Sequence, residues 1–175
     1  LHTLEAFGLR AVSLGFVLPK GSPVIWRGPM IGSGVRQLLH DVEWGELDYL
    51  IVDLPPGTSD ASMSMAQEAA IAGVVIVSTP QRVAVEDATK AVGMFDRLGV
   101  PVFGLVENMT SDVFGRGGAA AAADELGIEF LGEIPLDVAI RQGADNGAPI
   151  VATDPESEQA DAFLRLAEQV AARCS

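Results

Sequence analysis

The amino-acid sequence predicts an α/β domain in which a mostly parallel sheet is covered by helices on both faces. Short runs of β-branched and other apolar residues alternate with longer segments of helical character along the 175-residue chain. Several of these runs are apolar throughout, which is typical of strands buried on both faces of a parallel sheet. Polar residues follow directly after them, and ligands bind at this edge of such sheets.

The first half of the chain contains two short runs suited to strands and two longer segments suited to helices. Pro29 fits the first turn of the first helix, where its missing N–H costs nothing. Ser59 or Asp60 is expected to cap the second helix. The expected elements are, in order, a strand Val12–Val17, a helix Pro29–His40, a strand Tyr49–Val52 and a helix Ala61–Ala70.

The second half continues the alternation. Apolar residues recur every three or four positions from Val85 to Leu98, as on one face of a helix. Gly127 is placed to end an alanine-rich helix, because glycine adopts the left-handed cap conformation without steric cost. The expected strands are Val74–Val77, Val102–Val106 and one beginning at Phe130–Leu131, and the expected helices are Val85–Leu98, Gly118–Leu126, Leu136–Gln142 and Glu156–Arg173.

Composition indicates one well-packed domain over residues 1–175. The net charge of −13, from 11 basic and 24 acidic residues, makes nucleic acid and anionic membrane surfaces poor partners. The longest apolar run, Ala69–Val77, is far shorter than the roughly 18 residues that cross a bilayer. Cys174 is the only cysteine, so no disulfide forms within the chain and a cytoplasmic location is expected.

The sharpest motif is the segment Leu50–Thr58, an apolar run that ends in Asp53 and continues Leu-Pro-Pro-Gly-Thr. A buried strand ending in Asp is the Walker B pattern, whose carboxylate lies where Mg²⁺ meets nucleotide phosphates, often through water. Gly57 has no Cβ, so its backbone can approach a γ-phosphate. An Asp that caps a turn is the alternative for Asp53 alone, but the complete string favours a phosphate site.

Further polar clusters follow the later strands, and we expect them to share one edge of the sheet. Three groups are involved. They are Thr79-Pro80-Gln81 after Val74–Val77, Glu107-Asn108 after Val102–Val106, and Pro135 with Asp137 after the last strand.

Several strings in the sequence together resemble the Mrp-type P-loop ATPases, relatives of MinD and ParA that carry or help assemble iron–sulfur clusters. The resemblance implies a P-loop NTPase fold of the deviant Walker A class, and it extends from about Leu9 to the C-terminal helix. The strings are Trp26-Arg27-Gly28-Pro29-Met30, Trp44–Tyr49, Asp53–Thr58, Ser78–Gln81, Val106–Met109, Phe114–Gly118 and Gly132–Asp137.

The resemblance implies a role for each matching position. Asp53 would be the catalytic Walker B carboxylate and would hold Mg²⁺ through a water molecule, while Gly57 would belong to the phosphate-sensing loop. Asn108 would recognise adenine, since its amide offers a donor and an acceptor, although a turn or capping role is the alternative. Pro135 and Asp137 would lie near the base and ribose. ATP and Mg²⁺ are the implied cofactors, and a homodimer with iron–sulfur recipient or assembly proteins is the implied assembly.

The sequence departs from this family in its phosphate-binding loop. The family's loop has the form GKGGVGKS on the first strand, and no such string occurs in the chain. Lys20 and Lys90 are the only lysines, and neither lies in a glycine-rich loop. We therefore expect the chain to be part of a longer protein, and ATP hydrolysis only where that protein supplies the loop. Phe114–Gly118 is interpreted as the start of a helix, with anion binding there as the lesser alternative.

The second departure concerns cysteine. Cluster-carrying members place a Cys-x-x-Cys pair where this chain has Thr110–Val113, and a [4Fe–4S] cluster shared by two protomers needs two thiolates from each. The single Cys174 does not support cluster binding by this chain. The hypotheses are an ATP-dependent iron–sulfur carrier or assembly protein, a non-catalytic scaffold that keeps only the fold, and a ParA- or MinD-like positioning ATPase. The acidic charge disfavours the last.

Overall fold

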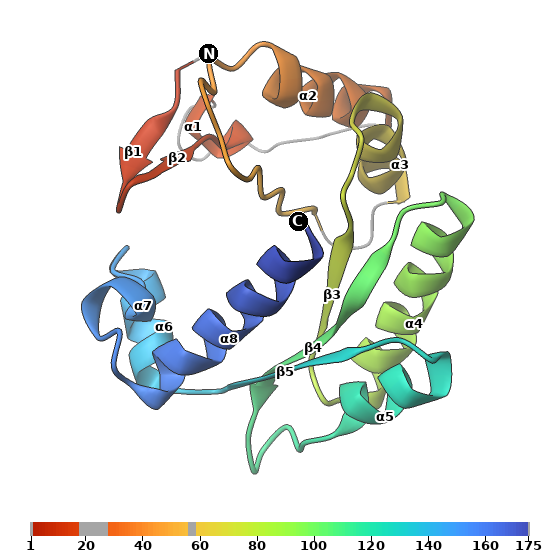
Figure 1. The fold of residues 1–175 in the computed structure, drawn as a ribbon, viewed down its shortest axis with the longest axis vertical. Coiled ribbons are helices and arrows are strands. Elements are labelled where there is room, and N and C mark those ends of the chain that lie inside the picture. The colour runs from red at the N-terminus through yellow and green to blue at the C-terminus, as the bar shows by residue number, and fades with distance from the viewer. Residues whose placement is uncertain (1, 18–27, 56–58, 175) are drawn as a thin grey trace. The chain divides into compact units, whose positions relative to one another are not determined.

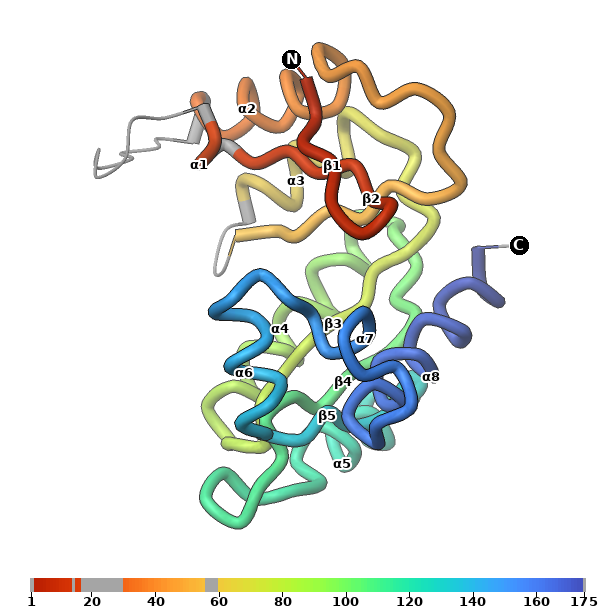
Figure 2. Tube along the Cα trace, turned by 90° about the vertical axis from the view of Figure 1, so that its left-hand side faces the viewer, coloured from red at the N-terminus to blue at the C-terminus, as the bar shows by residue number. Residues whose placement is uncertain are grey.

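The computed structural model describes residues 2–17, 28–55 and 59–174. The chain divides into two compact units, Leu1–Ile71 and Ala72–Ser175, each of which is described by itself. Figure 1 labels the elements of both units, and Figure 2 follows the same path of the chain as a tube. The expectation of a single domain over residues 1–175 stays a prediction.

The first unit opens with a hairpin that the sequence did not indicate. Strands β1 (Leu4–Ala6) and β2 (Leu9–Ala11) pair antiparallel, with Leu4 opposite Ala11. The two turn residues, Phe7 and Gly8, both have positive φ (52° and 75°), as in the tight turns that suit the twist of paired strands. Strands of three residues are too short to give a periodic signal.

The predicted strand Val12–Val17 is wrong, because Leu14–Val17 forms the short helix α1. Ser13 explains the difference. Its side-chain Oγ accepts a hydrogen bond from Gly15 N at 3.2 Å, and its carbonyl accepts one from Phe16 N at 3.0 Å. A serine that satisfies the first free amides of a helical turn favours that turn over an extended conformation.

The two predicted helices of this unit are present as α2 (Gly28–His40) and α3 (Ser59–Glu68). Ser59 and Asp60 lie inside α3 and do not precede it as a cap. The helices pack closely at Gly32, where an added Cβ would meet Ser64 Oγ at 3.1 Å. An ion pair between Arg36 Nη2 and Glu68 Oε1 at 2.5 Å also joins them.

The predicted strand Tyr49–Val52 is also wrong, since this segment makes no strand pairing in the structure. Its side chains are exposed, and Ile51 reaches 79%. A strand requires a hydrogen-bonded neighbour, and in the described residues of this unit β1 and β2 pair only with each other.

The second unit is built on a three-stranded parallel sheet in the order β3-β4-β5, which confirms the predicted α/β class. Each predicted strand is present. The helices that follow β3 and β4 pack beside each other, and the C-terminal helix covers the other face of the sheet (Figure 1). The elements are β3 (Val74–Ser78), α4 (Arg82–Arg97), β4 (Val102–Thr110), α5 (Gly118–Leu126), β5 (Phe130–Pro135), α6 (Val138–Asp145), α7 (Ile150–Thr153) and α8 (Glu158–Arg173).

The core of this unit lies on both faces of the central strand β4. Val106 belongs to a buried cluster with Leu131 and Ile134, against which Phe163 of α8 packs. Leu105, the preceding residue of β4, is completely buried on the opposite face, because side chains alternate along a strand. That face is covered by helices, whose buried residues are Ala88, Val92 and Phe95 of α4 and Ala119, Ala122 and Ala123 of α5.

Two further features of the fold bear on the predictions. Gly127 ends α5 with φ 66° and donates to Ala123 O and Asp124 O, as expected. Within the described part of the chain, no helix is long and apolar enough to cross a bilayer.

Candidate functional site

The ends of β4 and β5 bring together three residues that the sequence singled out, namely Asn108, Pro135 and Asp137. In the sheet register Asn108 lies opposite Ile134, and Pro135 lies opposite Thr110. The backbone N–H of Leu136 donates to Thr110 O at 3.0 Å, which continues the contact beyond the strands. The two neighbouring strands run parallel, so these residues share the carboxyl edge of the sheet.

Asn108 lies in an irregular part of β4. The register with β5 shifts between Asn108 and Thr110, and Met109 between them has φ 62°. This left-handed conformation costs a residue with a side chain roughly 1–2 kcal/mol. Asn108 Oδ1 accepts a hydrogen bond from Met109 N at 2.9 Å and so supports the turn. The second lone pair of Oδ1 and the side-chain NH₂ remain suited to a ligand.

Both carboxylate oxygens of Asp137 accept hydrogen bonds from other residues of the protein. It is the N-cap of α6, where Oδ1 accepts from Ala139 N at 2.6 Å. Its Oδ2 accepts from Gln159 Nε2 of α8 at 3.0 Å. These bonds explain why α6 begins at Val138, two residues after the predicted start at Leu136. The observed contacts of Asp137 are those of a cap that also joins α8 to the end of β5.

The sequence placed Glu107 in a polar cluster at this edge but did not indicate its individual role, although this residue organises the site. Its side chain is completely buried within β4, three residues before the end of the strand. Oε1 accepts from Gly117 N and Oε2 from Ala119 N, both at 2.6 Å. Hydrogen bonds from N–H groups to a carboxylate are strong, and the positive end of a helix dipole adds to them. The signal in the sequence is an acidic residue that ends a buried apolar strand, followed by a glycine-rich helix start.

Phe114–Gly118 therefore leads into a helix, as predicted. The negative charge at the start of this helix belongs to a side chain of the protein itself, the Glu107 carboxylate. Helix α5 begins at Gly118, and the Glu107 carboxylate occupies the amides of Gly117 and Ala119. The lesser alternative, in which these amides hold an external anion, does not fit the structure because the carboxylate already fills their donor capacity.

The third predicted cluster, Thr79-Pro80-Gln81, lies against the start of α5. An added Cβ at Gly118 would meet Pro80 O at 2.4 Å, so only glycine fits this contact. Gln81 is the N-cap of α4 by backbone position, without a capping bond from its side chain. In the part of the chain that the structure describes, its buried Oε1 has no hydrogen-bond partner.

Asp53 belongs to the first unit, whereas Asn108, Pro135 and Asp137 belong to the second. Asp53 is exposed and directly follows the segment 49–52, which forms neither a helix nor a strand. Gly57 lies outside the described residues. Among the residues that are described, no group of three or more His, Cys, Asp or Glu side chains is arranged to hold a metal ion. Asp53 alone is suited to an outer contact with Mg²⁺ through water, in which a single carboxylate is enough.

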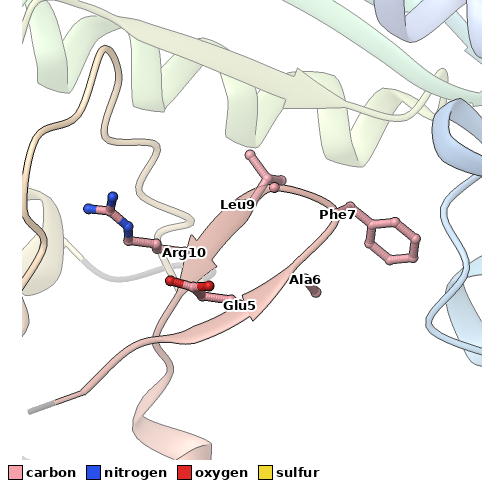
Figure 3. A pocket seen from close by; sticks show the side chains of 6 residues that line it. Glu5, Ala6, Phe7, Leu9 and Arg10 are labelled. Atoms are coloured by element: carbon pink, nitrogen blue, oxygen red, sulfur yellow. The ribbon is translucent and has the colours of Figure 1, made fainter.

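A shallow hollow lies beside the β1–β2 hairpin and is lined by residues 5–10 (Figure 3). None of its lining residues is a predicted site residue. The guanidinium of Arg10 donates to the carbonyls of Trp44 and Glu46, which fixes the hairpin to the loop after α2. The side chain of Arg10 is therefore used in holding the hairpin, and the hollow offers no convergent polar groups for a ligand.

Comparison with known proteins defines the class. The chain matches the family described as ParA, NUBPL iron-transfer P-loop NTPase, over residues 1–171. It therefore belongs to this family of P-loop NTPases, as the sequence motifs predicted.

Individual relatives support the same assignment. The chain is 46% identical to the iron–sulfur cluster carrier protein of Synechocystis, covering 96% of this chain and 51% of the relative. It is 42% identical to the iron–sulfur cluster transfer protein NUBPL of Mus musculus, covering 99% of this chain and 57% of the relative. The chain thus spans about half the length of the curated relatives it matches.

Solved structures agree with the fold. A nucleotide-binding protein of Archaeoglobus fulgidus in complex with ADP is 33% identical, with a TM-score of 0.68 over 90% of this chain and 64% of that one. The cell division ATPase MinD of Pyrococcus furiosus is 28% identical, with a TM-score of 0.65 over 79% of this chain and 57% of that one.

Proposed function

We propose that the chain belongs to an ATP-dependent iron–sulfur cluster carrier or assembly protein, in which it supplies the base-binding and Walker B parts of the nucleotide site. Membership of the NUBPL-type family supports this proposal. The observation that carries it is the position of Asn108, Pro135 and Asp137 at the shared carboxyl edge of two neighbouring parallel strands. Ligands bind at this edge in open α/β sheets.

The residues at this edge fit an adenine nucleotide. Asn108 is half-buried, and its amide can accept from the adenine amine and donate to a ring nitrogen. Pro135 supplies an apolar surface beside it, and Asp137 holds α6 and α8 at the rim. We assign the Mg²⁺ contact and the catalytic carboxylate to Asp53, and contact with the γ-phosphate to Gly57. When bound, Mg²⁺ would neutralise the developing charge on the phosphates.

The cluster is cargo in this proposal, and its ligands come largely from elsewhere. Cys174 is the only thiol of the chain and is exposed. Two copies would bring two such thiols, which is fewer than the four that a [4Fe–4S] cluster uses. We therefore infer a homodimer that acts with recipient or assembly proteins in the cytoplasm, with no nucleic acid and no membrane as partner.

A titration of MgADP into the ¹⁵N-labelled chain, followed by NMR, tests the base-binding part. Without a GKGGVGKS loop the affinity is expected to be weak, on the order of millimolar. We expect shifts concentrated at the backbone amides of Met109, Thr110 and Leu136, around Asn108. Shifts confined to Gly117 and Ala119, or none in this region at about 10 mM, would contradict the proposal.

A non-catalytic scaffold is the second candidate, favoured by the absence of both a GKGGVGKS string and a Cys-x-x-Cys pair from these 175 residues. A scaffold that has lost its ligand would give no nucleotide-dependent shifts in the same titration. The third hypothesis, a ParA- or MinD-like positioning ATPase, is distinguished by binding to anionic vesicles or DNA, which the charge of −13 disfavours.

The role of Asp53 is tested where a phosphate-binding loop is present, in a chimera that joins the loop-bearing segment of a family member to this chain. We expect Asp53→Asn to reduce ATP turnover to background, because the amide cannot support Mg²⁺ as the carboxylate does. Asp48→Asn, five residues earlier in the same exposed segment, is the matched control and should leave turnover unchanged. Full turnover in the Asp53→Asn chimera would exclude the Walker B assignment.

A further inference from the structure

We propose that Glu107 is a positioning residue of the nucleotide site, which holds Asn108 in the conformation that recognises the base. The inference rests on the proposed function for its ligand, but its structural part stands on contacts within the second unit. Glu107 contacts no predicted ligand position itself. It acts through the residue that follows it in β4.

Glu107 fixes both ends of the segment 108–116. Its backbone lies in the centre of the sheet, opposite Ser78 of β3 and Glu133 of β5. Its carboxylate reaches the amides of Gly117 and Ala119, ten and twelve residues later. One residue therefore closes a ring that contains Asn108, Met109 and the following turn, which limits the conformations open to all of them.

The turn inside this ring is also closed. Ser111 and Gly115 exchange two backbone hydrogen bonds, with Gly115 N to Ser111 O at 2.7 Å and the reverse bond at 3.2 Å. Ser111 Oγ accepts from Phe114 N at 3.1 Å. At the other side, Thr110 O accepts from Leu136 N. Hydrogen bonds to the rest of the protein thus hold the segment at both ends, and further bonds hold the turn within it.

Met109 is the point in the ring where the chain is strained. Its φ of 62° is unfavourable for a side-chain-bearing residue and persists only when the surroundings determine it. The same conformation presents Met109 N to Asn108 Oδ1 at 2.9 Å and so orients the Asn108 amide. If the Glu107 anchor is lost, Met109 can relax to negative φ, and the Asn108 amide is then free to rotate.

The preference of the chain between two nucleosides shows directly how firmly the Asn108 amide is held. Adenosine and inosine differ at position 6, where adenosine carries an amine donor and inosine a carbonyl acceptor. An oriented Asn108 amide distinguishes them, whereas a freely rotating amide can satisfy either. The preference for adenosine over inosine, measured by NMR titration of the 175-residue chain, therefore reports how well Asn108 is held.

Glu107→Gln is the first variant, because it keeps the shape but turns one acceptor oxygen into a donor that faces a backbone N–H. We expect at least tenfold faster hydrogen exchange at Gly117 and Ala119, a shifted Met109 amide signal and about a fivefold smaller adenosine preference. Glu133→Gln is the matched control. Glu133 lies opposite Glu107 on β5, and its exposed carboxylate pairs with Arg116 of the same segment. Loss of this surface pair should change none of the three readouts.

Two further variants keep the inference testable if Glu107→Gln folds poorly. Glu107→Asp retains the charge, and its adenosine preference should lie between those of the wild-type chain and Glu107→Gln. Met109→Gly removes the cost of positive φ, so in combination with Glu107→Gln or Glu107→Asp it should recover part of the adenosine preference. If Glu107 only stabilised the fold, the losses of adenosine preference in the combined variants would be additive, and Met109→Gly would recover none of it.

The possible outcomes are distinct. Unchanged Met109 signal and base preference in folded Glu107 variants would overturn the inference. If the wild-type chain does not distinguish adenosine from inosine, the proposed base site fails. In that case the Met109 and Asn108 side-chain signals still decide whether Glu107 holds this segment.

Discussion

At the scale of single residues, two acidic side chains near the same sheet edge have internal roles. Glu107 is buried and bonds to the start of α5, and Asp137 caps α6 while accepting from Gln159. Asn108 is different, because the hydrogen bond that its side chain accepts from Met109 N leaves most of its amide available. A sequence shows the positions of such residues but not their hydrogen-bond partners, which lie 1 to 22 residues away.

The prediction for Asn108 follows from this contrast. Asn108→Ala should bring the adenosine preference close to one and destabilise the chain by only about 1 kcal/mol, because a single bond to Met109 N is lost. NMR titration and urea denaturation measure the two effects. Asn146→Ala, at the exposed C-cap of α6, is the matched control and should keep the preference. An adenosine preference that survives in Asn108→Ala would exclude Asn108 from base recognition.

Two glycines of the second unit should respond to alanine in opposite directions. Gly104 has φ 150°, and an added Cβ would meet Glu129 O at 2.4 Å. Gly93, inside α4, has open space around the same position. We expect Gly104→Ala to destabilise the chain by about 2 kcal/mol or more through strain and overpacking. Gly93→Ala should stabilise it by about 0.5–1 kcal/mol through helix propensity. Equal urea midpoints for the two variants would contradict the close contact between β4 and Glu129.

At the scale of elements, the sequence correctly predicted the helices and strands that local periodicity determines. The helix predicted over Val85–Leu98 is α4, and the alanine-rich helix has the predicted bounds, Gly118–Leu126. The predicted strand Val102–Val106 is present but continues to Thr110, since the polar pair Glu107-Asn108 does not resemble the apolar run before it. Burial of a carboxylate in the sheet is possible only because α5 provides its partners.

Elements that depend on a distant partner could not be predicted in this way. Tyr49–Val52 has the composition of a buried strand but no pairing partner in the described residues of its unit. The β1–β2 hairpin depends on a two-residue turn at Phe7 and Gly8. For the candidate site, the structure places Asn108 within β4, two residues before its end, Pro135 at the end of β5 and Asp137 just after it. The roles of these residues, and those of Asp53 and Gly57, remain predictions.

The contact between α2 and α3 should depend on pH. The hydrogen bond from Arg36 is the main cause that lowers the pKa of Glu68, and Glu68 in turn raises the pKa of Arg36. A carboxyl group with a lower pKa in the folded state stabilises the fold above its unfolded pKa of about 4.3. This stabilisation is lost as the pH falls through the folded-state value.

Glu68→Gln should therefore flatten the acid side of the stability profile, measured as the urea midpoint between about pH 6 and pH 3. Glu86→Gln is the matched control, because it removes an exposed partner of Arg82 within α4 alone. An unchanged profile in Glu68→Gln would show that the Arg36–Glu68 pair does not contribute to stability in solution.

At the scale of the whole molecule, the two units differ in how well each buries its apolar residues. The second unit has a three-stranded sheet with helices on both faces and a buried cluster of Val106, Leu131 and Ile134. The first unit leaves large apolar side chains exposed along the segment 47–52. Burial of apolar surface is the main favourable term in folding, so the units should differ in independent stability.

The fragment Ala72–Ser175 is expected to fold on its own, and the fragment Leu1–Ile71 is not. Each can be produced separately and compared with the 175-residue chain by ¹H–¹⁵N NMR and urea denaturation. Dispersed signals of Ala72–Ser175 that overlay those of the chain, with a cooperative transition, would show that the sheet, Glu107 and the base-binding edge form without the first unit. If both fragments are unfolded, the units stabilise each other, and the sequence-based expectation of one domain over residues 1–175 is the correct description.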